Sequence, residues 1–339
     1  MLKLSFILPC YNVAPYVGRC IESIEHQEIP QSEYEVICVD DCSKDNTVEV
    51  IKEYQKKYPN ILLICHEVNK TAGGARNTGM DAAKGEYIWF VDPDDAIVEN
   101  VLGYLTKEIE RLNVDILFFN YNYINEEGET HAVQQFNGTY DILTGQEFFL
   151  TYSKKKHLAE VTSIWHEVFL SSYLKNKAIR YPEIKSSQDV VFVWHAFIKA
   201  QRVTAISNVA YNHYRRSSST TGSRGKYKAI NVISAPLLYV SKLMELNANT
   251  EMKQVYHEDL LFACTVSINN DSRKVLMMSL NEQRNFYYEM QKYKDLIIQT
   301  QSLMNRKTKV IFCYKLPYVL WQLMMWLYMA KDGIKKVVG

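Results

Sequence analysis

The sequence predicts an α/β fold in which a mostly parallel sheet is flanked by helices and is followed by a helical C-terminal region. Four short apolar runs occur in the first hundred residues, segments with helical spacing separate them, and polar segments follow the runs directly. Continuous apolar runs are typical of strands that are buried on both faces, as in a parallel sheet with helices on each side.

The elements are expected in the following order. Strands are predicted at 4–8, 34–39, 61–64 and 87–91, and the helices between them at 17–27, 47–57 and 74–83. Further along, we expect strands within 115–122, a hairpin or loop at 125–130, and helices at 146–152 and 190–200. A Ser-, Thr- and Gly-rich stretch at 217–225 predicts a boundary between a catalytic domain, 1–220, and a helical region, 221–339.

Composition excludes some classes of protein. The net charge of +1 over 339 residues gives no electrostatic case for nucleic-acid binding. Seven cysteines occur without a CxxC pair, which predicts free thiols in a reducing compartment and no zinc site. No signal peptide or sufficiently long apolar run is visible, so we expect a cytoplasmic protein.

An acidic turn is expected at the end of the fourth strand, where Asp92, Asp94 and Asp95 fall within four residues. Carboxylates this close repel one another unless they are solvated, cap a helix or bind a cation. Hard oxygen ligands suit Mg²⁺ or Mn²⁺, which bridge to phosphate oxygens. The alternative is that Asp94 or Asp95 caps a helix beginning near Ile97.

Two other strand-end segments carry polar side chains. Asp41 follows the second strand and either accepts a hydrogen bond from a base N–H or forms a turn, whereas Asp45 is expected to cap the next helix. Arg76 follows two glycines at a helix start, where it either binds an anion or is a surface arginine. Ligands bind beyond the carboxyl ends of the strands in such sheets, and these segments fall there.

Taken together, these segments resemble the inverting family 2 glycosyltransferases of the GT-A fold, a Rossmann-like architecture. The resemblance lies in the segments 5–12, 39–47, 73–79 and 85–95, is dense over 3–105 and becomes looser to about 220. It implies a nucleotide-sugar donor, and the nucleotide is expected to contact these residues: Pro9, Tyr11, Asn12, Asp41, Arg76, Asp94, His213 and Arg215. It also implies a Mn²⁺ or Mg²⁺ ion on Asp95, with Asp94 and Asp92 beside it.

The same resemblance requires a general base, for which Asp189 is the best candidate; the alternative is a helix N-cap. Gln188 stands where the family commonly has an acid, so the pKa of Asp189 is expected to be raised less than in an acidic pair. His166 and Glu167 depart from the family's Trp-Asn-Lys element, which predicts altered acceptor contacts.

The predicted function is metal-dependent, inverting transfer of a sugar, with a UDP-sugar favoured, to an acceptor hydroxyl in polysaccharide or lipopolysaccharide assembly. The acceptor is expected to be a saccharide or a lipid-linked saccharide. One alternative is a nucleotidyltransferase, which normally needs a glycine-rich phosphate loop that Pro9–Asn12 does not supply. Another is a catalytically degenerate scaffold that binds a carbohydrate or a partner.

The C-terminal segment 307–336 combines aromatic and apolar residues with flanking lysines. Such a segment is typical of an interfacial anchor on an anionic leaflet, which would make the protein peripheral on the cytoplasmic face of a membrane. The alternative is a helix docked on the catalytic domain or on the partner of a homodimer.

Overall fold

The structure is a computed structural model that describes residues 2–138, 140–152, 163–183, 188–215, 248–249, 251–253 and 279–291. The chain divides into two compact units, Met1–Ser223 and Arg224–Gly339. The predicted boundary at 217–225 and the predicted membrane segment 307–336 lie outside the described residues.

Four parallel strands form the first half of the sheet. They are β1 (Leu4–Cys10), β2 (Tyr34–Asp40), β3 (Ile61–Cys65) and β4 (Tyr87–Phe90), in the spatial order β3-β2-β1-β4. All pairings among them are parallel, and Cys10 lies opposite Asp40 at the ends of β1 and β2. The polar segments after β1, β2 and β4 therefore meet at one edge of the sheet, as the sequence predicts.

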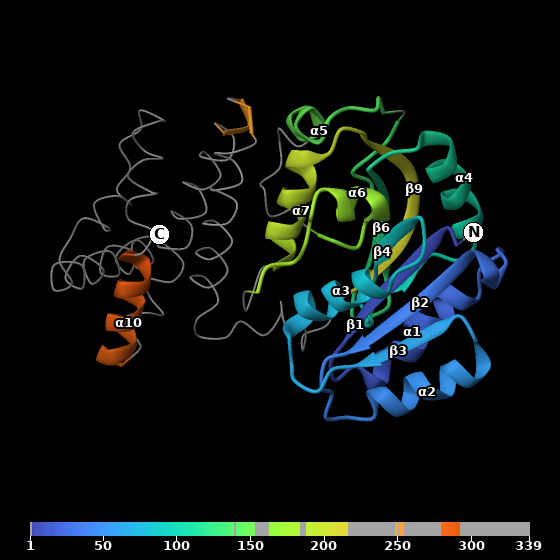
Figure 1. Ribbon diagram of the computed structural model, residues 1–339, viewed down its shortest axis with the longest axis horizontal. Coiled ribbons are helices and arrows are strands. Elements are labelled where there is room, and N and C mark those ends of the chain that lie inside the picture. The colour runs from blue at the N-terminus through green and yellow to red at the C-terminus, as the bar shows by residue number, and fades with distance from the viewer. Residues whose placement is uncertain are drawn as a thin grey trace. The chain divides into compact units, whose positions relative to one another are not determined.

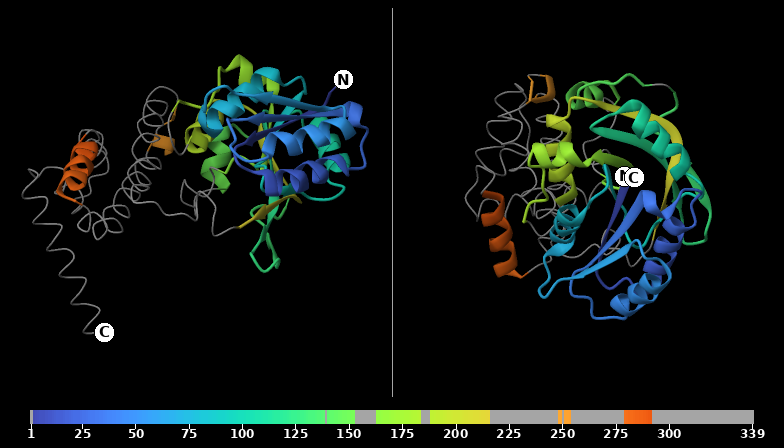
Figure 2. Two further views of the ribbon diagram at one scale, coloured as in Figure 1. Left: turned by 90° about the horizontal axis from the view of Figure 1, so that it is seen from below. Right: turned by 45° about the vertical axis from the view of Figure 1, so that its right-hand side comes forward.

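Helices cover both faces of this half (Figures 1 and 2). Ile37 and Val39 of β2 pack against Ala75 of α3 (Thr71–Ala82). Val36 and Cys38 alternate with them and lie in the main core, which includes Ile51 of α2. The helices α1 (Ala14–Glu25) and α2 (Thr47–Lys57) lie on the face opposite α3, and a 3-10 turn, η1 (Gln31–Glu33), precedes β2. This two-sided burial explains the continuous apolar strands.

The second half of the sheet is mixed. β8 (Glu167–Leu170) runs antiparallel to both β4 and β6 (Ile116–Ile124), and β9 (Val203–Tyr214) runs parallel to β6. β7 (Thr130–Val133) forms a hairpin with β6 that projects from the body in the left panel of Figure 2. The α/β prediction is confirmed, and the parallel arrangement gives way to antiparallel pairing on either side of β8.

One sequence prediction is wrong at the acidic turn. No helix begins near Ile97; instead, Ala96–Ile97 forms β5, which pairs antiparallel with β9, and α4 begins later (Leu102–Leu112). Asp94 and Asp95 therefore do not cap a helix. The short apolar pair Ala96–Ile97 carries too little periodicity to distinguish a strand from a helix start.

The remaining described helices are α5 (Gly145–Tyr152), α6 (Ser171–Asn176), α7 (Gln188–Lys199) and, in the second unit, α10 (Leu280–Gln291). In the first unit an aromatic cluster joins α7 to the sheet: Phe192 packs on Phe90, Phe169 and Tyr181. Tyr181 and Phe192 stack with centroids 4.2 Å apart, so α7 is held against β4 and β8.

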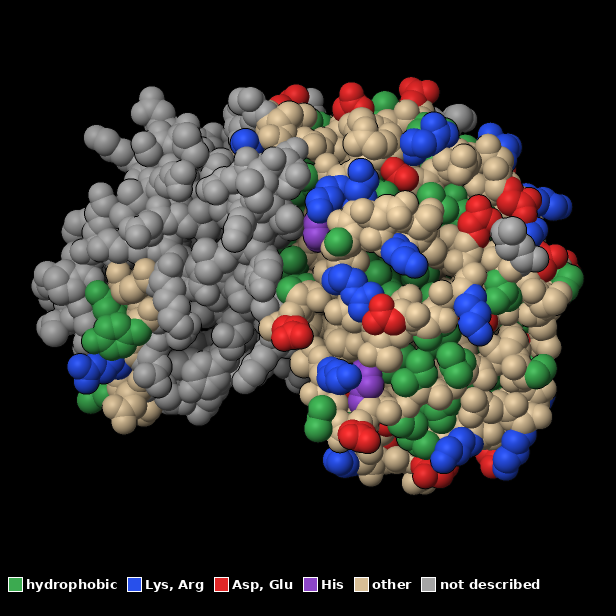
Figure 3. Space-filling view, viewed as in Figure 1, with side chains coloured by type: hydrophobic (Ala, Val, Ile, Leu, Met, Phe, Trp, Pro, Cys, Tyr) green, Lys and Arg blue, Asp and Glu red, His purple; other side chains and the backbone are tan. Residues whose placement is uncertain are grey.

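The surface of the described part of the first unit carries interspersed basic and acidic side chains on the face in Figure 3, without a large field of either sign. None of the helices in the described ranges has the length and apolar character needed to cross a bilayer. Free thiols are confirmed for the described cysteines, which are Cys10, Cys20, Cys38, Cys42 and Cys65.

Candidate functional site

The acidic turn after β4 gathers three carboxylates. Asp92, Asp94 and Asp95 each offer an oxygen, and these oxygens lie within 4.8 Å of one another. A backbone hydrogen bond from Asp95 N to Asp92 O, 2.9 Å long, closes the turn. Anionic oxygens at this spacing fit Mg²⁺ or Mn²⁺, which take hard oxygen ligands, and the cation would offset their mutual repulsion.

Asp95 is the most constrained of the three. It is 1% exposed, its Oδ2 accepts the hydroxyl of Tyr211 at 2.8 Å, and its Oδ1 accepts the backbone N–H of Tyr214 at 2.8 Å. His213 Nδ1 lies 3.0 Å from Asp95 Oδ2. Burial raises the pKa of Asp95, and the hydrogen bond to His213 opposes that shift. Asp95 thus fixes β9 beside the turn and brings His213 to the predicted metal site.

Arg76 connects the acidic turn to the candidate base. Its guanidinium donates to Asp92 Oδ1 at 2.8 Å and to Asp189 Oδ1 at 2.6 Å. Arg76 is only 4% exposed, so it is no surface arginine. Because α3, the turn after β4 and α7 each supply one member, this chain of charges exists only in the folded protein.

Asp189 lies inside the first turn of α7, which begins at Gln188, so the alternative of an N-cap is not supported. Its side chain is 40% exposed, and none of the described residues bonds its Oδ2. Burial raises the pKa of Asp189, Arg76 opposes the shift, and the charge of Asp92 adds to it. Asp189 Oδ1 is therefore held by the guanidinium of Arg76, and Oδ2 is available to take a proton.

Gln188, a departure from the family pattern, holds the start of α3. Its side-chain Oε1 accepts the backbone N–H of Gly73 at 2.7 Å, and its Nε2 donates to Thr71 Oγ1 at 2.5 Å. A Cβ on Gly73 would lie 2.6 Å from Gln188 Oε1, so glycine is needed for this approach. The contact fixes α3 against α7 close to Arg76, a role that the sequence did not reveal.

We expect Gln188→Ala to destabilise the protein, because it leaves the buried N–H of Gly73 without an acceptor. The expected cost is about 1–3 kcal/mol in the free energy of unfolding, measured by chemical denaturation. Gln188→Glu is the matched control, since a carboxylate accepts from Gly73 N–H and from a rotated Thr71 hydroxyl. Equal stability of wild type and Gln188→Ala would contradict this assignment.

His166 and Glu167 form a buried pair near the start of β8. They are 1% and 0% exposed, and His166 Nδ1 lies 3.0 Å from Glu167 Oε2. Burial raises the pKa of Glu167, and His166 opposes the shift. Because neither side chain reaches the surface, any effect on an acceptor passes through their neighbours.

Four of the residues predicted to contact the nucleotide lie at the ends of β1 and β2: Pro9, Tyr11, Asn12 and Asp41. Tyr11 is 49% exposed, whereas Pro9 is half-buried within β1. Asn12 has a left-handed backbone (φ 52°), and its side chain accepts the backbone N–H of Lys44 at 2.7 Å. Asn12 thereby ties the two strand ends together. Asp45 accepts the N–H of Thr47, the first residue of α2, but Asn46 occupies the N-cap position, so the cap lies one residue later than predicted.

Two arginines make contacts that the sequence did not indicate. Arg215 donates to Tyr123 Oη at 2.9 Å on β6 and, among the described residues, makes no hydrogen bond to the acidic turn. Arg19 of α1, which the sequence did not single out, donates to the backbone carbonyl of Asp94 and lies 3.7 Å from the ring centroid of Tyr214. A lone arginine on a helix carries no spacing signal, so only the fold places it there.

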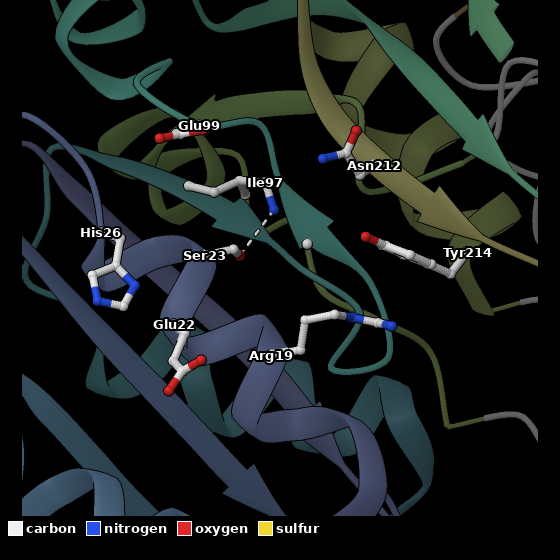
Figure 4. Close-up of a pocket in the computed structure, with 9 residues that line it drawn as sticks. Arg19, Glu22, Ser23, His26, Ile97, Glu99, Asn212 and Tyr214 are labelled. Atoms are coloured by element: carbon white, nitrogen blue, oxygen red, sulfur yellow. Dashed lines mark hydrogen bonds between the residues drawn. The ribbon is translucent and has the colours of Figure 1, made fainter. Parts of the chain in front are cut away.

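A cavity of about 470 Å³ opens beside the turn, between α1, β5 and β9 (Figure 4). Figure 4 shows Arg19 reaching towards Tyr214, and Ser23 Oγ accepting the N–H of Ile97 at 3.1 Å. Its lining contains no residue that the sequence predicted for the site: Arg19, Glu22, Ser23, His26, Ala96, Ile97, Glu99, Asn212 and Tyr214. The cavity adjoins the acidic turn but does not include its carboxylates.

Comparison with known proteins assigns the family. Residues 5–174 match the model for "Glycosyl transferase family 2". A poly(ribitol-phosphate) beta-glucosyltransferase of Bacillus spizizenii is 26% identical over 302 residues, which cover 88% of this chain and 42% of that protein. The uncharacterized glycosyltransferase EpsJ of Bacillus subtilis is 30% identical over 222 residues, 64% of this chain and 62% of that one.

The fold also matches solved structures. The crystal structure of S. aureus TarS 1-349 in complex with UDP-GlcNAc aligns with a TM-score of 0.70 at 24% identity, covering 89% of this chain and 84% of that chain. This chain spans about two fifths of the length of the poly(ribitol-phosphate) transferases it matches, 42% and 43%. The match to the family model covers half of the sequence and includes the acidic turn and Arg76. The chain belongs to glycosyl transferase family 2.

Proposed function

We propose that this chain transfers a sugar from a UDP-sugar to an acceptor hydroxyl, with inversion at the anomeric carbon and with Mg²⁺ or Mn²⁺ as cofactor. The observation that carries the proposal is the continuous chain of charges Asp92–Arg76–Asp189, which joins three clustered carboxylates to a half-exposed aspartate. A cluster of carboxylates that can hold a cation and a general base are the two groups that a metal-dependent transfer of this kind would use.

The donor end is assigned to the edge formed by β1, β2 and β4. Pro9, Tyr11 and Asn12 would line the base and ribose pocket, and Asp41 would accept a base N–H. Asp95, with Asp94 and Asp92, would hold the cation, whose chemistry when bound is to stabilise negative charge on the leaving diphosphate. His213 lies beside Asp95 and would face the diphosphate. The UDP-GlcNAc in the TarS complex supports uracil as the base of the donor.

At the acceptor end, Asp189 would take the proton of the attacking hydroxyl on its Oδ2. The new bond joins the acceptor oxygen to the anomeric carbon, and the bond between that carbon and the diphosphate oxygen breaks. Arg76 keeps Asp189 Oδ1 in place and would balance charge between the base and the acidic turn. Attack from the face opposite the leaving group inverts the configuration.

The acceptor class is proposed to be a cell-surface polymer or its lipid-linked precursor. The named activities of the relatives, transfer of sugars to poly(ribitol-phosphate), support a polymer rich in hydroxyls. Membrane attachment through 307–336 and a homodimer stay predictions, since those residues lie outside the described part of the chain.

Release of UDP from a panel of UDP-sugars, with Mn²⁺ or Mg²⁺ and then with chelator, tests the proposal. Metal-dependent release supports the enzyme. A catalytically degenerate scaffold would bind the nucleotide without releasing UDP from any donor, with or without a hydroxyl-rich acceptor.

Transfer is expected to fall as the pH is lowered into the acid range. Asp189 works only when deprotonated, and its pKa lies above the ordinary value of 3.8 because the surrounding protein partly desolvates the carboxylate. As the pH falls through that raised pKa, the base is protonated and kcat declines, at a higher pH than an exposed aspartate would give. A pH profile of kcat under saturating donor checks this; a flat profile down to pH 4 would contradict it.

A further inference from the structure

A buried histidine lies behind the aspartate assigned to the base pocket. His66 follows β3 and its side chain is 4% exposed. Its Nδ1 lies 2.8 Å from Asp41 Oδ1, and its Nε2 lies 2.9 Å from Thr78 Oγ1 on α3. The three side chains form a continuous hydrogen-bonded row from α3 to the end of β2.

Within the described part of the chain, one oxygen of Asp41 has no hydrogen-bond donor. Oδ1 accepts the backbone N–H of Lys70 at 2.8 Å in addition to the contact with His66. No described residue bonds Oδ2, and Asp41 is 2% exposed. A carboxylate that is anchored through one oxygen cannot rotate freely, so the direction of Oδ2 is fixed.

Proton chemistry fits this arrangement. An ionised carboxylate only accepts hydrogen bonds, so the Nδ1 of His66 is the donor to Asp41. The hydroxyl of Thr78 can donate to a neutral Nε2 or accept from a protonated one, and it therefore satisfies the ring in either state. In either state of the ring, Asp41 is therefore the acceptor in the hydrogen bond with His66.

We propose that Thr78 and His66 position Asp41 Oδ2 to accept a ring N–H, and that this row selects donors whose base carries that N–H. The inference rests on the proposed function. Uracil, thymine and guanine offer a ring N–H, whereas cytosine and adenine present a lone pair at the corresponding nitrogen. A site built around a buried acceptor rejects a base that cannot donate to it, because the acceptor is then left unpaired. His66 is a positioning residue, since it touches Asp41 and not the nucleotide.

Two amide substitutions distinguish the roles of the two ring nitrogens of His66. His66→Asn keeps an N–H near the place of Nδ1 and retains the contact with Asp41. His66→Gln reaches towards Thr78 and loses the donor to Asp41. The affinities of UDP and CDP, measured by titration calorimetry at a fixed Mn²⁺ concentration, give a ratio for each variant. His131→Gln on β7, where the side chain is 62% exposed, is the control.

Wild type, His66→Asn and His131→Gln are expected to prefer UDP over CDP by about tenfold or more. His66→Gln is expected to lower that preference about tenfold, because the affinity for UDP falls while the affinity for CDP stays nearly unchanged. Thr78→Val, which removes only the hydroxyl, should lower it about threefold and provides a second test if His66→Gln does not fold.

An unchanged UDP-to-CDP ratio in both His66→Gln and Thr78→Val would overturn the proposal. An equal loss of both nucleotides in His66→Asn and His66→Gln would also overturn it, because His66 would then serve packing alone. Failure of wild type to bind UDP at all would instead remove the proposed donor, and the positioning role with it.

Discussion

Asp189→Asn is expected to lower kcat for sugar transfer by about 10²–10⁴-fold while the affinity for UDP stays unchanged. The amide keeps the size of the side chain, and its oxygen can still accept from Arg76, but it cannot take the proton of the acceptor hydroxyl. Asp189 Oδ1 is 2.6 Å from Arg76, so its oxygen position is defined in wild type. Steady-state transfer to an acceptor and calorimetric UDP titration measure the two quantities separately.

Asp81→Asn is the matched control for that variant. Asp81 also pairs with an arginine, Arg180, at 2.6 Å, but both side chains are exposed on the surface. It should leave kcat unchanged. If Asp189→Asn retained full turnover, the general base would have to be another group, and the role given to α7 would fail.

Arg76→Ala is expected to lower the free energy of unfolding by about 2–3 kcal/mol and to abolish transfer. The substitution leaves Asp92 and Asp189 without their shared guanidinium. Their side chains are 30% and 40% exposed, so water offsets part of the cost of the unpaired charges. Chemical denaturation measures the stability, and UDP release measures the activity.

The surface pair again supplies the control. Arg180→Ala removes the partner of Asp81, where the two side chains are 41% and 67% exposed, and should cost about 0–1 kcal/mol. If Arg76→Ala were as mild as Arg180→Ala, the bridge between the acidic turn and the base would contribute nothing to the fold.

The N-terminal half of the fold could be predicted because its signals are local. The helix at 47–57 matches α2 at both ends, and the predicted strands all coincide with β1 to β4 within a few residues. Uninterrupted apolar runs and polar strand ends are sufficient to predict a parallel sheet. The mixed half of the sheet was harder to predict from the sequence, because β8 is four residues long and pairs with strands that are remote in sequence.

The individual site residues could be named from their motifs, but their connections could not. Arg76 and Asp189 are 113 residues apart, and nothing in either segment indicates that they form an ion pair. The contact of Gln188 with Gly73 and the row from Thr78 through His66 to Asp41 are likewise long-range. A buried histidine without a motif carries no local signal, and it becomes informative only when its partners are known.

The most direct test of the central claim is a calorimetric titration of UDP with Mn²⁺ present and after chelation, on wild type and on Asp94→Asn. We predict that chelation weakens UDP binding to wild type by at least about tenfold, since the cation links the acidic turn to the diphosphate. Asp94→Asn should reproduce part of that loss in the presence of Mn²⁺. Equal UDP affinity in Mn²⁺ and in chelator would contradict the claim that these carboxylates hold the donor through a metal ion.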